Sequence, residues 1–219
     1  ITRLDYQSQY VGIDTQVQRQ YLYPSFSMNA NYRFTKSKSL YLNYNYDYDF
    51  ATAREILPIE NLANAMNTII GNENLSPTKT HNFYLSFRDY NFTTKSGYDF
   101  YIGGNLNDAN IVSISSFDDS RKRTTTYINV DGVNNFWMGT SWNKSVKRDA
   151  HSYRYSVGLS GSIDNNIGFT DQERYKALSY RISPRLRFNY DYGDVLSIAP
   201  SYNLTFRNTE YTNYIIDER

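Results

Sequence analysis

Apolar and polar residues alternate strictly along several stretches of the chain. In residues 25–35 the apolar positions are Phe26, Met28, Ala30, Tyr32 and Phe34, and polar residues occupy nearly every position between them. The same alternation returns over residues 39–50, 182–190 and 196–207. Successive side chains of a β-strand point to opposite faces of a sheet, so alternation of this kind indicates strands. These stretches are therefore predicted to be strands with one apolar and one polar face.

Two architectures produce such strands, and three features favour a membrane barrel over a soluble sheet. The strands run for about ten residues or more, which a tilted membrane-spanning strand needs, whereas soluble strands usually have about five or six. The polar faces carry arginine, aspartate, asparagine and serine but few lysines or glutamates. Aromatic residues gather near strand ends on the apolar face, as in the aromatic girdles of barrels: Phe34, Tyr48, Phe50, Trp142, Tyr153 and Tyr190. The pattern predicts an all-β, antiparallel, up-and-down transmembrane β-barrel.

The connections between strands alternate between short and long. Short turns are expected at 36–38, 91–97, 143–151 and 191–194, and longer segments at 14–20, 51–80, 117–123 and 164–176. In outer-membrane barrels the short turns are periplasmic and the long loops extracellular. The strands 98–116 and 124–142 are expected to project beyond the bilayer. Within 51–80, Pro58, apolar residues at helical spacing and Gly71 predict one helix.

The strand count suggests a part of a larger barrel. About nine strands are expected, the first a poor match over residues 2–11, whereas bacterial single-chain barrels have even numbers. The sequence starts at Ile1 without an initiator methionine or signal peptide, and it ends at Arg219 without a closing strand that has a terminal aromatic residue. We therefore expect residues 1–219 to be one partial barrel domain, with no internal boundary.

Composition removes several other classes of protein. The 219 residues contain no cysteine and two histidines, which excludes disulfide scaffolds and Cys/His metal clusters. The formal net charge is +1 and the mean hydropathy is −0.67, so neither a polyanion partner nor an apolar helical span is indicated. Tyrosines lie on the apolar faces and arginines on the polar faces, which argues against a nucleic-acid stacking groove. No nucleophile, base and acid can be combined into an active site, so no enzyme and no cofactor is predicted.

One segment resembles a motif of a known family. Residues 71–80, Gly-Asn-Glu-Asn-Leu-Ser-Pro-Thr-Lys-Thr, resemble the G-N-P-x-L-K-P-E motif of TonB-dependent receptors, including SusC-like receptors. The matching residues are Gly71, Asn72, Asn74, Leu75 and Pro77, whereas Glu73, Ser76 and Thr78 differ. In that family the motif ends an extracellular loop and leads into a barrel strand.

The resemblance implies a function that extends beyond these residues. Such receptors have a 22-stranded barrel filled by a plug domain, and they import a siderophore, glycan, vitamin or peptide with energy relayed by TonB. The plug, the TonB-contacting segment and the remaining strands would lie outside the chain. The implied partners are outer-membrane lipid, the plug and TonB. A surface lipoprotein that covers the barrel as a lid is a further candidate partner. The implied location is the outer membrane of a Gram-negative bacterium.

Candidate site residues lie on the polar faces and in the long loop. Five arginines near the short turns form a guanidinium ring that faces the plug, or else simply pair with neighbouring strands: Arg33, Arg88, Arg154, Arg185 and Arg187. Asp47 and Asp49 share one face and are candidate contacts for a cationic ligand or a metal ion, or else belong to a solvated lumen rim, since two carboxylates alone make no calcium site. Met66 is a candidate ligand contact in the long loop, or else packs on the barrel rim. The chain is thus expected to form part of the wall and loops of a TonB-dependent transporter, and the alternative is a structural or adhesive barrel without energised transport.

Overall fold

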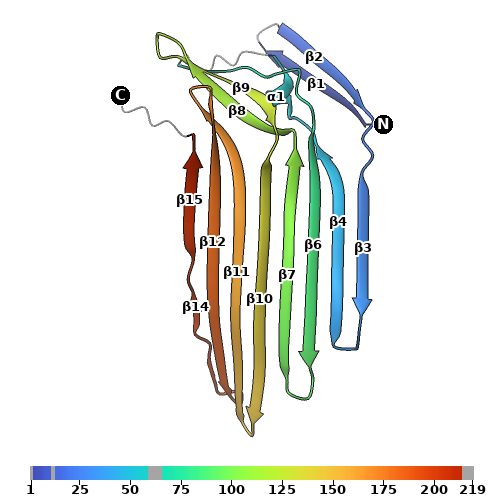
Figure 1. The fold of residues 1–219 in the computed structure, drawn as a ribbon, viewed down its shortest axis with the longest axis vertical. Helices are drawn as coiled ribbons and strands as arrows, with labels where there is room; N and C mark the ends of the chain where they lie inside the picture. The colour runs from blue at the N-terminus through green and yellow to red at the C-terminus, as the bar shows by residue number, and fades with distance from the viewer. Residues whose placement is uncertain (1, 11–12, 59–65, 214–219) are drawn as a thin grey trace.

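The computed structural model describes residues 2–10, 13–58 and 66–213. Figure 1 shows long antiparallel strands that lie side by side in one tall sheet, with smaller elements gathered at one end. The main sheet has ten strands. Their bounds are β3 (Phe26–Arg33), β4 (Lys38–Asp49), β6 (Thr78–Asn91), β7 (Ser96–Asp108), β10 (Val133–Arg148), β11 (His151–Thr170), β12 (Glu173–Tyr192), β13 (Leu196–Ile198), β14 (Ser201–Asn203) and β15 (Phe206–Thr212).

All neighbours in this sheet are antiparallel and follow the order of the chain. The order is β3-β4-β6-β7-β10-β11-β12, and β13, β14 and β15 then pair in turn with successive parts of β12. Short turns join the strands at the lower end in Figure 1, where 34–37, 92–95, 149–150 and 193–195 lie. Two longer connections, over 109–132 and between β4 and β6 (described residues 50–58 and 66–77), lie at the opposite end, which we call the loop end.

The register confirms the alternation of faces along the strands. Met28 pairs with Tyr44, Tyr44 with Phe83, and Phe136 with Ile163, so apolar residues share one face across the sheet. This apolar face is not a buried core, because Ile182, Leu186 and Phe206 are 54%, 51% and 61% exposed. A sheet with such a face needs an apolar environment outside the chain. The sheet is therefore all-β, antiparallel and up-and-down, as predicted, and one of its faces is apolar and exposed.

The described chain buries its apolar core at the loop end, outside the main sheet. Four buried residues, Ala51, Ile56, Leu57 and Leu75, pack together there, with Tyr6, Val17, Ile111 and Tyr127 against them. The elements that supply these residues and their surroundings are β1 (Thr2–Tyr10), β2 (Ile13–Tyr21), α1 (Ala53–Ile56), β5 (Asn67–Ile69), β8 (Asn110–Phe117) and β9 (Arg123–Val130). We call this assembly the loop cap; β1 pairs with β2, and β9 lies between β5 and β8.

The predicted strand count is wrong. The described residues contain fifteen strands in three sheets instead of about nine in one. The main sheet is open, and the described residues form no closed barrel. The predicted strands 98–116 and 124–142 each break in two, at Ala109 (φ 54°) and at Asp131–Gly132 (Gly132 φ 94°). Their outer halves, β8 and β9, leave the main sheet for the loop cap. The last strand is divided into β13, β14 and β15. The first break lies at Pro200 and the second opposite Pro184 of β12, and neither proline has an N–H to donate.

Several predicted connections also differ. The segment 164–176 is no loop: β11 and β12 are each twenty residues long and meet at Asp171 and Gln172, whose φ angles of 49° and 68° make a tight hairpin. Residues 14–20 belong to β2. Most of the helix expected between Pro58 and Gly71 lies in residues 59–65, outside the described part, and residues 67–69 form β5 instead of its last turn. The short helix α1 ends before Pro58 and was not predicted. Within that part, no helix is long and apolar enough to cross a membrane.

Candidate functional site

The polar face of the main sheet carries rows of hydrogen-bonded side chains. One row of directly paired positions consists of Ser27, Asn45, Asn82, Asn105, Asn135, Asp164, Ser179 and Thr209. Along it Ser27 donates to Asn45 (2.7 Å), Asn135 donates to Asp164, and the Ser179 and Thr209 hydroxyls lie 2.8 Å apart. These amides, hydroxyls and the Asp164 carboxylate hydrogen-bond one another in this way and present a hydrophilic wall.

Asp47 and Asp49 lie above this row, on the polar face of β4 at the loop end. Asp49 borders a cavity of about 380 Å³, in which the Thr80 hydroxyl donates to Asn107 (3.0 Å). The residues that line this cavity are Asp49, Phe50, Glu55, Thr78, Thr80, Asn105, Asn107, Asn110 and Ile111. Carboxylates, amides and hydroxyls side by side can hydrogen-bond a polar or cationic ligand. The chemistry of the cavity thus fits the role predicted for Asp49.

Met66 does not line this cavity. Its backbone carbonyl accepts a hydrogen bond from the Arg123 N–H (2.9 Å), which ties it to the start of β9 in the loop cap. The Met66 side chain is 57% exposed. The structure therefore brings Asp47 and Asp49 onto the same end of one strand, and places Met66 elsewhere in the loop cap.

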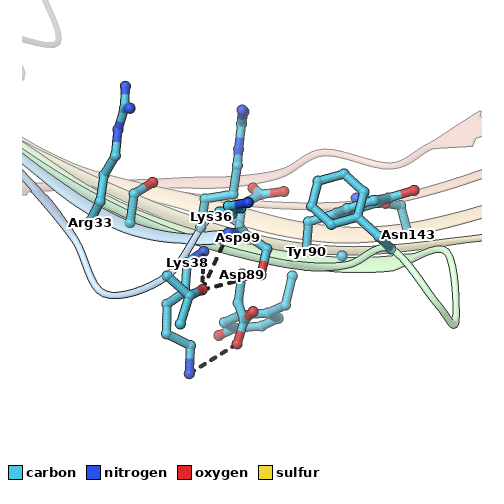
Figure 2. Close-up of a pocket in the computed structure, with 14 residues that line it drawn as sticks. Arg33, Lys36, Lys38, Asp89, Tyr90, Asp99 and Asn143 are labelled. Atoms are coloured by element: carbon cyan, nitrogen blue, oxygen red, sulfur yellow. Dashed lines mark hydrogen bonds and ion pairs between the residues drawn. The ribbon is translucent and has the colours of Figure 1, made fainter.

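Three of the predicted arginines occupy one transverse row near the short turns. The directly paired positions of this row are Arg33, Ser39, Arg88, Asp99, Ser141, Gly158, Arg185 and Asn203. Arg33 and Arg88 border a cavity of about 610 Å³ together with Asp99. Figure 2 shows Arg33 on one side of the sheet and Lys38 on the other, where Lys38 forms an ion pair with Asp89 (3.1 Å). Both faces at this end thus carry positive and negative side chains.

Arg154 and Arg187 differ in their surroundings. The Arg154 guanidinium forms an ion pair with the Asp191 carboxylate on the neighbouring strand (2.6 Å), so it follows the simpler alternative of cross-strand pairing. Arg187 lies two residues beyond Arg185 on the same face of β12. Both border a hollow of about 220 Å³ whose floor includes the small residues Ser156, Gly158 and Ser160 of β11.

Sequence reasoning missed two arginines on the same face. Arg181 of β12 and Arg207 of β15 are directly paired on the polar face, in one register with Ser162. Both lie in the strands whose alternation had already been recognised, at positions of the same parity as Arg185 and Arg187. This parity alone could have identified both arginines, but the sequence prediction considered only positions near the short turns.

Residues 71–77, which we call the motif segment, hold the loop cap together. Leu75 is 4% exposed in the apolar core, and Gly71 lies so close to Leu57 that a Cβ would stand 2.1 Å from the Leu57 carbonyl oxygen. The Asn72 side chain donates to the Tyr127 carbonyl (2.9 Å), and its backbone N–H donates to the Glu55 carbonyl (2.7 Å). The segment therefore connects α1, β9 and the start of β6, where the buried Pro77 precedes the strand.

Neither histidine has the surroundings of a catalytic base. His81 Nδ1 lies 2.8 Å from the Tyr44 hydroxyl, and His151 Nδ1 lies 2.8 Å from the Tyr190 hydroxyl. The two rings lie on the apolar face near opposite ends of the strands, each beside several tyrosines. In 2–10, 13–58 and 66–213, no group of three or more His, Cys, Asp or Glu residues is arranged to hold a metal ion. The described residues thus offer donors, acceptors and charges for binding.

Comparison with known proteins identifies the family. No curated protein and no solved structure matches the chain. Residues 2–216 match the outer membrane protein beta-barrel family, which agrees with the long antiparallel strands and the exposed apolar face. A match over nearly the whole chain also fixes its location. The chain belongs to the outer membrane protein beta-barrel family and lies in the outer membrane of a Gram-negative bacterium.

Proposed function

We propose that this chain forms part of the barrel wall and outer loops of a TonB-dependent receptor that imports a scarce ligand, namely a siderophore, glycan, vitamin or peptide. The observation that supports this function best is the setting of the motif segment. Residues 71–77 end the long connection after β4, supply Leu75 to the loop cap and lead into β6. The resembling motif of those receptors has the same position, between an outer loop and a barrel strand.

The open sheet supports a larger barrel. Among the described residues, β3 has a neighbour on one side only, and β13, β14 and β15 pair only with β12. Unpaired backbone groups in the hydrocarbon of a bilayer cost several kcal/mol each, so only closed barrels and helices span membranes. Further strands must complete the sheet, and a 22-stranded barrel, whose lumen is wide enough for a plug, meets this requirement.

Within this proposal the polar face lines the lumen and the loop end is extracellular. The cavity beside Asp49 then opens at the outer mouth, where an arriving ligand meets the wall. Arg33, Arg88, Arg185 and Arg187 face the plug domain nearer the periplasmic turns. The plug and TonB are partners supplied from outside these residues, and the chain itself contributes no catalytic step.

The test is binding of the complete native polypeptide to TonB. The protein is purified from outer membranes in detergent, its mass is measured, and the isolated periplasmic domain of TonB is titrated into it by calorimetry. A polypeptide several-fold heavier than 25.6 kDa that binds the TonB domain saturably supports the proposal. Absence of binding by the intact protein contradicts it and favours the structural or adhesive barrel.

A further inference from the structure

Charged side chains on the polar face are segregated along the strands. Asp47, Asp49 and Asp164 lie towards the loop end, where no arginine of the main sheet shares that face. Seven arginines lie on the same face from the middle of the strands towards the short turns: Arg33, Arg88, Arg154, Arg181, Arg185, Arg187 and Arg207. The carboxylates among them are Asp99, which accepts a hydrogen bond from Ser141 (2.5 Å), and Asp191, which pairs with Arg154.

Four of these arginines form a patch on two adjacent strands, which we call the arginine patch: Arg181, Arg185 and Arg187 of β12 and Arg207 of β15. Arg181 and Arg207 are directly opposite each other. Within the part of the chain that the structure describes, none of the four guanidinium groups has an ion-pair partner, and all four residues are exposed. Like charges at directly opposite positions destabilise a strand pair, and a guanidinium does not lose its proton to relieve the repulsion. The patch therefore requires anionic groups or water in front of it.

We propose that the arginine patch is the docking site for an acidic segment of the domain that fills the barrel. This inference rests on the proposed function and adds the chemistry of the partner surface. The six-residue interval from Arg181 to Arg187 spans about 20 Å at roughly 3.3 Å per residue. One small anion contacts only part of such a length, whereas a polypeptide that presents several carboxylates matches it. Guanidinium groups bind carboxylates in bidentate geometry, which fixes orientation as well as charge.

The surface next to the patch is shaped to admit such a segment. On the neighbouring strand β11 the residues of the same face are Ser156, Gly158, Ser160 and Ser162, and the first three line the 220 Å³ hollow beside Arg185 and Arg187. These small side chains leave room in front of the guanidinium groups. A cationic wall with a shallow floor thus fits an acidic chain lying along the strands. By contrast, in the row that runs from Ser27 to Thr209, nearer the loop end, the polar side chains already hydrogen-bond one another.

The experiment measures how firmly the barrel is closed, using the complete protein in planar bilayers. The variant R181Q/R185Q/R207Q removes three charges from the patch. R121Q is the control for loss of an exposed arginine away from the patch, because Arg121 lies exposed in the β8–β9 turn of the loop cap. Ion current is recorded during urea titration at low and high salt. We expect wild type and R121Q to open at the same urea concentration and to open more easily in high salt. The triple variant should open at lower urea, with little further effect of salt.

Different results separate the two proposals. A triple variant that opens at the same urea concentration as wild type overturns the acidic-segment inference while the barrel remains closed. Wild-type protein that conducts as a wide pore without urea shows that nothing fills the barrel, which overturns the proposed function itself. A current that inorganic phosphate blocks in wild type but not in the triple variant, without a change in the urea midpoint, assigns the patch to a free anion and also overturns the inference.

Discussion

Adjacent residues of one strand face opposite environments in this protein. In β12, Leu186 belongs to the apolar face with Val157, whereas Arg185 and Arg187 on either side belong to the polar face. The side chain of Leu186 is half exposed because the chain itself supplies nothing to cover it. In the membrane, lipid covers this position, so a charge introduced there loses its hydration.

Leu186→Arg should therefore lower the free energy of unfolding by about 2–4 kcal/mol, the cost of a cation near the bilayer midplane of a barrel. Tyr44→Arg on the same face should behave alike. The matched change Asn43→Arg on the polar face, and Arg185→Lys, should leave the fold intact. The measurement is denaturant unfolding of the complete protein in lipid vesicles, and equal losses on both faces would show that the apolar face does not meet lipid.

A second residue-scale prediction concerns Gly71. Gly71→Ala places a Cβ about 2.1 Å from the Leu57 carbonyl oxygen, so the backbones at residues 71 and 57 must move apart in the loop cap. We expect faster protease cleavage of the loops in intact outer membranes, with the strands unaffected. The control is Gly158→Ala, whose Cβ would meet its nearest atom at 3.5 Å. Equal protease resistance of Gly71→Ala and wild type would contradict the close packing of the motif segment.

At the scale of elements, the loop cap is held by hydrogen bonds between segments that are far apart in the sequence. The Asn129 side chain of β9 accepts from the Ser76 N–H (2.8 Å) and donates to the carbonyls of Ser76 (2.8 Å) and Ala109 (2.6 Å). It therefore joins the end of the long loop to the break between β7 and β8. Such cross-links hold the segments of the loop cap in one arrangement.

Asn129→Ala should loosen this junction, because it removes three hydrogen bonds, each of which contributes about 0.5–1.5 kcal/mol to stability. Hydrogen exchange of the 66–78 backbone should speed up, while that of β11 and β12 stays unchanged. Asn74→Ala is the control, because the Asn74 side chain lies exposed and makes none of these bonds. If both variants exchange alike, Asn129 does not hold the loop cap.

The strands of the main sheet could be predicted from the sequence, whereas the loop cap could not. Period-two alternation locates β3, β4 and β12 because each has one apolar and one polar face. The cap contains β5, which has only three residues, and β8 and β9, which the sequence predicted only as continuations of main-sheet strands. Contacts with distant segments determine where these strands lie. The turn at Asp171–Gln172 was also missed. The residues around it are mostly polar although they belong to strands, so their composition indicates a loop over 164–176. Asp49 was nominated from its face alone, but its cavity depends on α1 and β8.

At the scale of the whole molecule, the sheet separates two environments. One face is apolar and exposed, with tyrosine–histidine clusters near both ends of the strands, and the other carries amides, hydroxyls and arginines. In the outer membrane, lipid covers the first face and water meets the second. The two faces of every strand of the main sheet thus lie in different environments.

The most direct test of this claim is spin labelling along β4 in the complete protein in native-like bilayers. The described sequence has no cysteine, so single cysteines are introduced at successive positions from 40 to 45. Collision with oxygen, which dissolves in lipid, should be high at Leu40, Leu42 and Tyr44, and collision with a water-soluble nickel chelate should be high at Tyr41, Asn43 and Asn45. Accessibilities without this two-residue period, or with the two faces exchanged, would contradict the account.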